Sequence, residues 1–210
     1  MRTAPLLLAL TLLSSLPVVA CGPGKPPEGP TGPRTRFREG DFVVYRYTGT
    51  YTKEPVVLRE QILAQKGLEL RIGVSVRRGI DERKWVQVVT DLPENRKNEV
   101  VDALFLEDHG NLRRLENKKN HDLYALYEWT FLLPDGKPLT VADEKRELTI
   151  QGTHFDCDVR VGKTKVQGRV LSFEEVECPD FLWTHAGGRF WDEATSEEVY
   201  RAEVVAFGHK

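Results

Sequence analysis

Neither positive nor negative charge is in large excess in this sequence. Its 30 lysine and arginine residues nearly balance 32 aspartate and glutamate residues, which gives a formal net charge of −2. The two signs are mixed along the whole length, without the basic stripes that bind phosphate backbones. The composition therefore predicts that no nucleic acid is a partner.

Catalytic signatures are also missing. The sequence contains no His-Glu-x-x-His zinc motif, no Gly-x-Ser-x-Gly nucleophile elbow, no phosphate-binding loop and no dinucleotide fingerprint. It has no Cys-x-x-Cys redox pair either. Because each of these motifs carries the chemistry of a large enzyme class, the sequence favours a protein that is not an enzyme and uses no cofactor.

Long hydrophobic runs are scarce, and the one that is present lies near the N-terminus. Residues 6–13 are almost all leucine, follow the positive charge of Arg2, and are too few to span a membrane. A short positive segment followed by such a run is typical of a secretory signal peptide. No second run approaches the length of a membrane span, so we expect an exported protein that does not cross the membrane.

The end of this N-terminal segment carries a cysteine in a specific context. Val18-Val19-Ala20-Cys21 resembles the lipobox of bacterial lipoproteins. The resemblance covers residues 1–21 and implies that the Cys21 thiol receives a diacylglycerol, that the chain is cut before Cys21, and that the new amino group is acylated. Two or three acyl chains hold a protein stably on a membrane, because each buried methylene contributes ~0.8 kcal/mol.

The resemblance also implies a location. Lipoproteins with a residue other than aspartate after the cysteine, here Gly22, commonly reach the outer membrane of Gram-negative cells. We therefore expect the cell envelope, with the protein anchored to the outer membrane and facing the periplasm or the cell surface. Residues 1–20 are the predicted signal peptide and residues 21–35 a lipidated, proline- and glycine-rich tether. Residues 36–210 are the predicted β-rich globular domain.

Most of that domain has the β-branched and aromatic content of strands, interrupted by turn residues. Glycine-containing turns at Gly67, at 79–81 and at 108–111 predict antiparallel hairpins. The predicted strands are residues 42–51, 56–64, 68–76, 84–90, 100–107, 112–115, 147–150, 154–161, 170–176, 188–191 and 199–207. Residues 92–97 are predicted to be a polar break.

One segment is ambiguous between helix and strand. Residues 123–129 fit helical spacing, with Asn120 or Asp122 as the cap, but residues 129–133 also suit a strand. The fold class predicted overall is mostly β: a single antiparallel, strongly curved sheet or partly open β-barrel, with at most a short helix.

Besides the lipobox cysteine, the sequence has only Cys157 and Cys178. In an oxidising compartment an even pair most simply forms a disulfide, worth ~3 kcal/mol for a loop of about 20 residues. If Gln167-Gly168 is a hairpin turn, the two cysteines lie opposite each other. If Gly162-Lys163 is the turn, the bond must reach a neighbouring segment. Two free thiols or a redox site are the alternatives.

Aromatic residues provide the candidate binding site. A curved sheet lined by them would hold an acyl chain or another apolar ligand. The alternative is that the same residues form a solid core, as aromatic residues usually do. The candidate ligand-binding residues are Tyr45, Tyr47, Trp85, Tyr127 and Trp183.

A second candidate is a polar set on one predicted strand. His154, Asp156 and Asp158 alternate, so their side chains share one face, and an imidazole with two carboxylates is able to bind a divalent metal. A half-solvated strand has the same alternation, and one strand rarely supplies a complete site. We therefore predict no metal site and keep a metal-dependent enzyme or periplasmic hydrolase as an alternative.

Taken together, these features favour a membrane-anchored envelope lipoprotein that binds a protein partner or an apolar ligand without catalysis. In general outline, it is similar to the outer-membrane lipoprotein receptors with a half-barrel that carry lipidated clients. The resemblance concerns architecture only. This sequence, unlike those receptors, has no clear helix directly after its tether. Besides the enzyme, the other alternative is a purely structural surface lipoprotein.

Overall fold

A computed structural model describes residues 36–116 and 121–210, all of which belong to one unit, Pro33–Lys210. The predicted signal peptide, Cys21 and the tether lie outside the described residues, as does Asn120. Among the described residues, no helix has the length and apolar character needed to cross a membrane.

Eleven strands and two short helices make up the described residues. The first part contains β1 (Asp41–Thr48), β2 (Val56–Lys66), β3 (Glu69–Arg78), β4 (Asp81–Thr90), α1 (Pro93–Lys97), β5 (Ala103–Asp108) and β6 (Asn111–Leu115). The second part contains α2 (His121–Tyr127), β7 (Thr140–Ile150), β8 (Thr153–Val166), β9 (Arg169–Glu177), β10 (His185–Trp191) and β11 (Glu198–His209).

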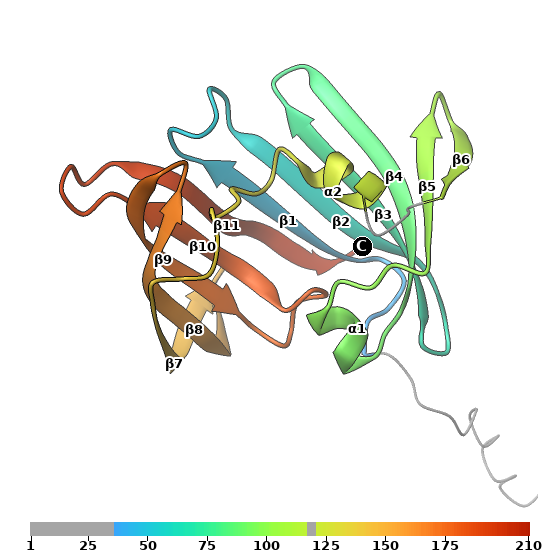
Figure 1. The fold of residues 1–210 in the computed structure, drawn as a ribbon. Coiled ribbons are helices and arrows are strands. Elements are labelled where there is room, and N and C mark those ends of the chain that lie inside the picture. Colours follow the sequence, from blue (N-terminus) through green and yellow to red (C-terminus); the bar gives the residue numbers. More distant parts are fainter. Residues whose placement is uncertain (1–35, 117–120) are drawn as a thin grey trace, which may run out of the picture. The chain divides into compact units, whose positions relative to one another are not determined.

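The strands form one sheet in the order β6-β5-β4-β3-β2-β1-β11-β10-β9-β8-β7. Every pair is antiparallel, and the pairing of β1 with β11 joins the two halves of the chain at the middle of the sheet. The sheet is strongly curved and not closed, with β6 and β7 at its two edges (Figure 1). This confirms the predicted fold class.

The concave face of the sheet carries the core. In β3, Leu70, Ile72, Val74 and Val76 are all at most 3% exposed, while the residues between them point to the other face. Successive side chains of a strand alternate between faces, so this period of two fixes which side is buried. Burial of each such side chain contributes about 1.5–3 kcal/mol.

A segment that we call the strap, residues 121–139, crosses this face (Figure 1). It begins with α2 near β4, where the Arg83 guanidinium donates to the Ala125 carbonyl at 2.9 Å. It ends at β8, where the amide of Leu139 donates to the carbonyl of Lys163 at 2.7 Å. Helix α2 confirms the helical interpretation of this region, with Asp122 in the first turn and not at the cap.

The hairpin of β8 and β9 confirms the predicted disulfide. Val166 lies opposite Arg169, so the turn is at Gln167-Gly168, and the alternative turn at Gly162-Lys163 is wrong. The register continues to the two cysteines, which form a disulfide with their Cα atoms 4.4 Å apart. Both cysteines are buried.

Two predicted boundaries are wrong for physical reasons. The expected polar break at 92–97 contains the one-turn helix α1, which starts with proline, a residue whose fixed φ suits the first helical turn. Strand β7 extends from Thr140 to Ile150, much further than the predicted 147–150. It is an edge strand, exposed along most of its length, so its sequence lacks the apolar alternation that reveals a strand.

Candidate ligand-binding cavity

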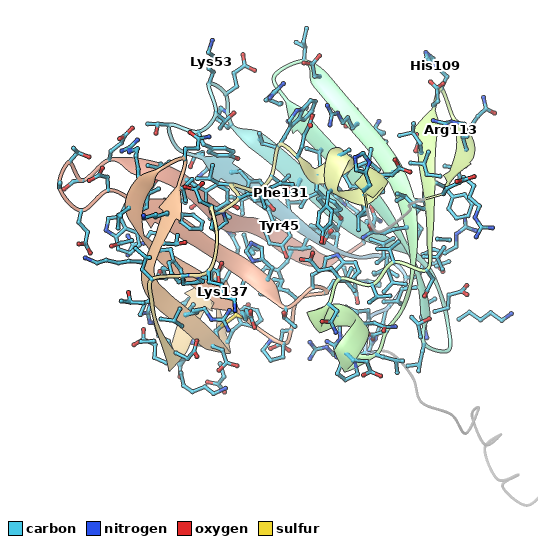
Figure 2. The ribbon with its side chains drawn as sticks, in the orientation of Figure 1. Tyr45, Lys53, His109, Arg113, Phe131 and Lys137 are labelled. Atoms are coloured by element: carbon cyan, nitrogen blue, oxygen red, sulfur yellow. A yellow bond between two sulfur atoms is a disulfide. The ribbon has the colours of Figure 1, made fainter. Side chains whose placement is uncertain are left out.

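A cavity of about 270 Å³ lies between the concave face and the strap. This volume is slightly below the range of about 300–1,000 Å³ that is usual for small-molecule pockets. Tyr45 from β1 and Phe131 from the strap, both labelled in Figure 2, line it from the sheet side and the strap side. Its other aromatic lining residues are Tyr47, Tyr124, Tyr127, Trp183, Phe190 and Tyr200.

The strap is held over the cavity by hydrogen bonds to its backbone. Tyr51 donates to the Trp129 carbonyl at 3.0 Å, and Tyr200 donates to the Thr130 carbonyl at 2.9 Å. The Arg83 guanidinium lies 3.8 Å from the centre of the Trp129 ring, a cation–π contact. These contacts come from β4, from β11 and from the turn that follows β1, so they fix the strap at several points.

The structure brings together four of the five aromatic residues predicted from the sequence. Tyr45, Tyr47, Tyr127 and Trp183 all line the cavity. Trp85 does not: it is 1% exposed and packs edge-on against Tyr127, with the ring centres 4.8 Å apart. Its role is to support the cavity wall, and ligand binding by the other four stays a prediction.

A buried carboxyl group in the cavity wall was missed by the sequence analysis. Glu60 on β2 is 3% exposed, and its Oε1 accepts hydrogen bonds from the Tyr127 hydroxyl at 2.8 Å and the Trp183 indole at 3.2 Å. Within the described part of the chain, no lysine or arginine forms an ion pair with it. Burial raises the pKa of Glu60 to about 7, against the two hydrogen bonds, which lower it.

The sequence did contain a signal for this residue. Val56, Leu58, Glu60 and Ile62 occupy alternate positions of one strand and are all buried. The period of two therefore places a carboxyl group on an apolar face, which is unfavourable unless the site compensates for it. A charged residue in phase with core residues indicates a functional position more specifically than the aromatic content does.

A short chain of hydrogen bonds extends from Glu60 into the core. Gln87, fully buried on β4, donates to the Tyr127 hydroxyl at 3.4 Å and accepts from the Trp85 indole at 3.4 Å. Tyr127 in turn donates to Glu60. The chain fixes the orientation of the Tyr127 hydroxyl, so the carboxyl group is held in a defined position.

The charged side chains that line the cavity, Glu60 included, are mostly acidic. Its lining includes four glutamates and one arginine. Burial raises the pKa of Glu99, which follows α1 with a left-handed φ of 51°, and that of Glu175 on β9. Burial lowers the pKa of His185 to about 4, so this imidazole is neutral at pH 7. Tyr45 donates to the carbonyl of His185 at 2.8 Å.

A second hollow of about 350 Å³ has Glu60 in its wall as well. Its wall contains the cluster of Phe155, Phe181 and Phe207, whose ring centres are 5.3–5.9 Å apart. Glu60 lines both spaces.

The alternative polar set lies elsewhere. His154, Asp156 and Asp158 are exposed on β8; His154 pairs with Glu147 at 2.9 Å, and Asp158 forms an ion pair with Lys145. Among the described residues, no cluster of histidine, cysteine, aspartate and glutamate has the geometry of a metal site. The set has the arrangement of a solvated strand face paired with its neighbour.

Fold and site together define an open, curved antiparallel sheet with an aromatic, strap-covered cavity and a buried carboxyl group in its wall. No family model matches the sequence, and no curated protein matches it. Among solved structures, the chain is similar to a protein of Bacteroides fragilis with a YmcC-like fold, with a TM-score of 0.37 and 6% identity. The match covers 84% of this chain and 98% of that chain. At these values it supports no functional assignment, which therefore depends on the geometry of the cavity.

Proposed function

We propose that this chain is a non-enzymatic binding protein of the bacterial cell envelope. In this proposal Cys21 carries the lipid anchor, and the sheet domain takes up a small, largely apolar ligand in the cavity beneath the strap. The observation that carries the proposal is the cavity itself, of about 270 Å³ and lined by aromatic side chains. A purely structural domain gains no stability from such a space, because an unfilled cavity forfeits packing contacts.

The lining has the composition of a small-molecule site. Apolar and aromatic walls supply affinity, at about 25 cal/mol per Å² of apolar surface removed from water. A few fixed polar groups supply orientation. Here the hydrogen-bonded Glu60 and Tyr127 have that second role, since their positions do not depend on a ligand. The cavity favours a small ligand, or one end of a longer chain, over a protein partner.

Native mass spectrometry of the full chain, purified from membranes, tests this proposal. We expect a non-covalently retained apolar molecule in addition to the mass of the lipidated chain. Leu58→Trp provides the decisive variant, because Leu58 is 4% exposed and lines the cavity. Its larger side chain should fill the space and abolish retention.

Leu63→Trp is the matched control. Leu63 lies on the same strand but is 45% exposed and does not line the cavity. Near-ultraviolet circular dichroism establishes that both variants keep the fold. Retention by the Leu58→Trp protein, or no retained molecule in any of the three proteins, would contradict the proposal.

A further inference from the structure

The carboxyl group of Glu60 has one oxygen engaged and one open. Both hydrogen bonds, from Tyr127 and from Trp183, reach Oε1. No donor in the described part of the chain reaches Oε2, although the side chain is 3% exposed and lines the cavity. This oxygen is not one of the fully buried side-chain atoms that lack a partner, so it opens onto the cavity, where a donor of a ligand is able to reach it.

The charge on this group is also not neutralised. An ionised carboxylate in an apolar site is costly unless a cation accompanies it. No lysine or arginine of the described residues contributes one, and the nearby hydrogen-bond donors are neutral. A ligand that brings a positive charge would remove this cost, whereas a neutral ligand of the same size would not.

The other charged groups of the lining are mixed in sign. Glu174 pairs with Arg146 at 3.1 Å and Glu175 with Arg160 at 3.8 Å, so these two carboxylates already have cations within the protein. The Arg189 Nε lies 3.8 Å from Glu174 Oε1 and is buried without a hydrogen-bond partner. Among the described residues that line the cavity, Glu60 and Glu99 are the carboxyl groups with no such cation. Near these two groups a cation is favoured over a fatty-acid carboxylate.

Aromatic rings lie around the same carboxyl group. Tyr127 and Trp183 contact it directly, and Tyr45 and Tyr47 line the same cavity with their rings 6.3 Å apart. Aromatic faces attract ammonium groups, and rings combined with a carboxylate form the cages that bind quaternary ammonium ligands. The same rings provide the apolar surface that the body of the ligand needs.

We propose that the cavity selects ligands with a positively charged nitrogen, a protonated amine or a quaternary ammonium, on a small apolar body, and that Glu60 receives this charge. The inference rests on the proposed function and adds the chemical class of the ligand. It separates this cavity from one that takes up neutral lipids or fatty acids.

Calorimetric titration of the full chain in zwitterionic nanodiscs tests the inference, with empty nanodiscs as the blank. The probes share one apolar body: hexyltrimethylammonium, hexanol and hexanoate. At about pH 8.5 we expect hexyltrimethylammonium to bind about tenfold more tightly than hexanol, and hexanoate more weakly than both.

The same series at about pH 5.5 tests whether a carboxyl group carries the preference, because the charge of a quaternary ammonium does not titrate. Glu60 is protonated below its pKa of about 7, so the preference should fall below about threefold. The groups that face Glu60 are Tyr127, Trp183, Tyr45, Tyr47 and Glu99. Of these only Glu99 is able to titrate with it, since burial raises the pKa of the tyrosines further.

Substitution of Glu60 assigns the effect to one residue. Glu60→Gln should reduce the preference for hexyltrimethylammonium over hexanol at about pH 8.5 to below about threefold. Glu69→Gln, the same change at an exposed position of β3, should keep the full preference. If Glu60→Gln fails to fold, the pH series is repeated on Glu99→Gln, which should keep both the preference and its loss at about pH 5.5.

The outcomes separate the two proposals. Equal binding of hexanol and hexyltrimethylammonium at about pH 8.5 would overturn the charge preference and leave the proposed function standing. If the preference for hexyltrimethylammonium persists in Glu60→Gln, Glu60 is not the group that receives the charge. Absence of binding by every probe would contradict both.

Discussion

At the scale of single residues, Glu60 couples the stability of the fold to pH. The pKa of this carboxyl group rises from an ordinary value of 4.5 to about 7 on folding. Between these values the folded state binds a proton that the unfolded state does not, so the free energy of unfolding decreases as pH rises. The contribution is fully present below pH 4.5 and lost above about pH 7, a loss of about 3 kcal/mol at most.

Glu60→Gln should remove this dependence. We expect the substituted protein to lose less stability than the unsubstituted one between about pH 5 and pH 8.5, by about 2–3 kcal/mol. Urea unfolding at the two pH values measures the difference. Glu69→Gln, at an exposed position, is the control and should follow the unsubstituted protein. Parallel profiles for all three proteins would show that burial of Glu60 does not shift its titration.

The residues of the cavity could be predicted from the sequence only in part. The aromatic content of the sequence indicated four of the lining residues, because large aromatic side chains usually cover the buried face of a sheet. These residues are Tyr45, Tyr47, Tyr127 and Trp183. Composition does not distinguish a ring that faces the cavity from one behind it, so Trp85 was included. Glu60 was detectable from its phase within β2, which is local information.

At the scale of elements, the strap depends on tyrosine hydroxyls from the sheet. Tyr200→Phe removes the donor to the Thr130 carbonyl and should cost about 1 kcal/mol, because a buried acceptor loses its partner. We expect the effect to be local: hydrogen exchange should accelerate in residues 121–139 more than in β2 and β3. Tyr124→Phe, on the exposed side of α2, serves as the control. Uniform acceleration across the sheet would contradict a local role.

The disulfide staples β8 to the segment after β9. Cys157 and Cys178 are separated by 21 residues, a loop for which the chain-entropy model gives about 3 kcal/mol. The double substitution to alanine should lower the free energy of unfolding by up to that amount, as measured by urea unfolding. The result should match that of the reduced, unsubstituted protein. An unchanged midpoint would indicate that the hairpin alone constrains this region in the unfolded chain.

A strand could be predicted from the sequence where one of its faces is buried and the other is exposed. Strands such as β3 alternate clearly and were predicted close to their observed bounds. Strand β7 was mostly missed, since an edge strand with solvent on both faces has no such pattern. The sequence left two turns open between β8 and β9. The structure has the turn at Gln167-Gly168, where both residues adopt the left-handed φ that suits a two-residue hairpin.

At the scale of the whole molecule, the proposal places the protein on a membrane through Cys21. Cys21→Ser removes the thiol on which the thioether depends, so it should abolish incorporation of labelled palmitate and leave the precursor uncut. Gel mobility and metabolic labelling in a bacterial host measure both. Cys157→Ser leaves the lipobox intact and should still be labelled. Labelling of the Cys21→Ser protein would contradict the proposed anchor.

The sequence predicted a single antiparallel sheet but not the order of all its strands. Short turns predict hairpins between neighbours, and most of the observed pairs are of this kind. The pairing of β1 with β11 is set by the whole sheet and has no local signal. The cavity follows from that pairing, since it brings the ring of Tyr47 of β1 to 6.1 Å from Tyr200 of β11, and the ring of Tyr45 to 5.8 Å from His185 of β10.

Photo-crosslinking tests the central claim, that the cavity beneath the strap is a binding site, most directly. A hexyltrimethylammonium analogue with a diazirine in its alkyl chain would be irradiated with the full chain, and the labelled peptides identified by mass spectrometry. The account predicts labels on the strap, β1 and β10, displaced by unlabelled hexyltrimethylammonium and absent from Leu58→Trp. Labels on β7 or the outer face of β8, or labelling unchanged in Leu58→Trp, would contradict it.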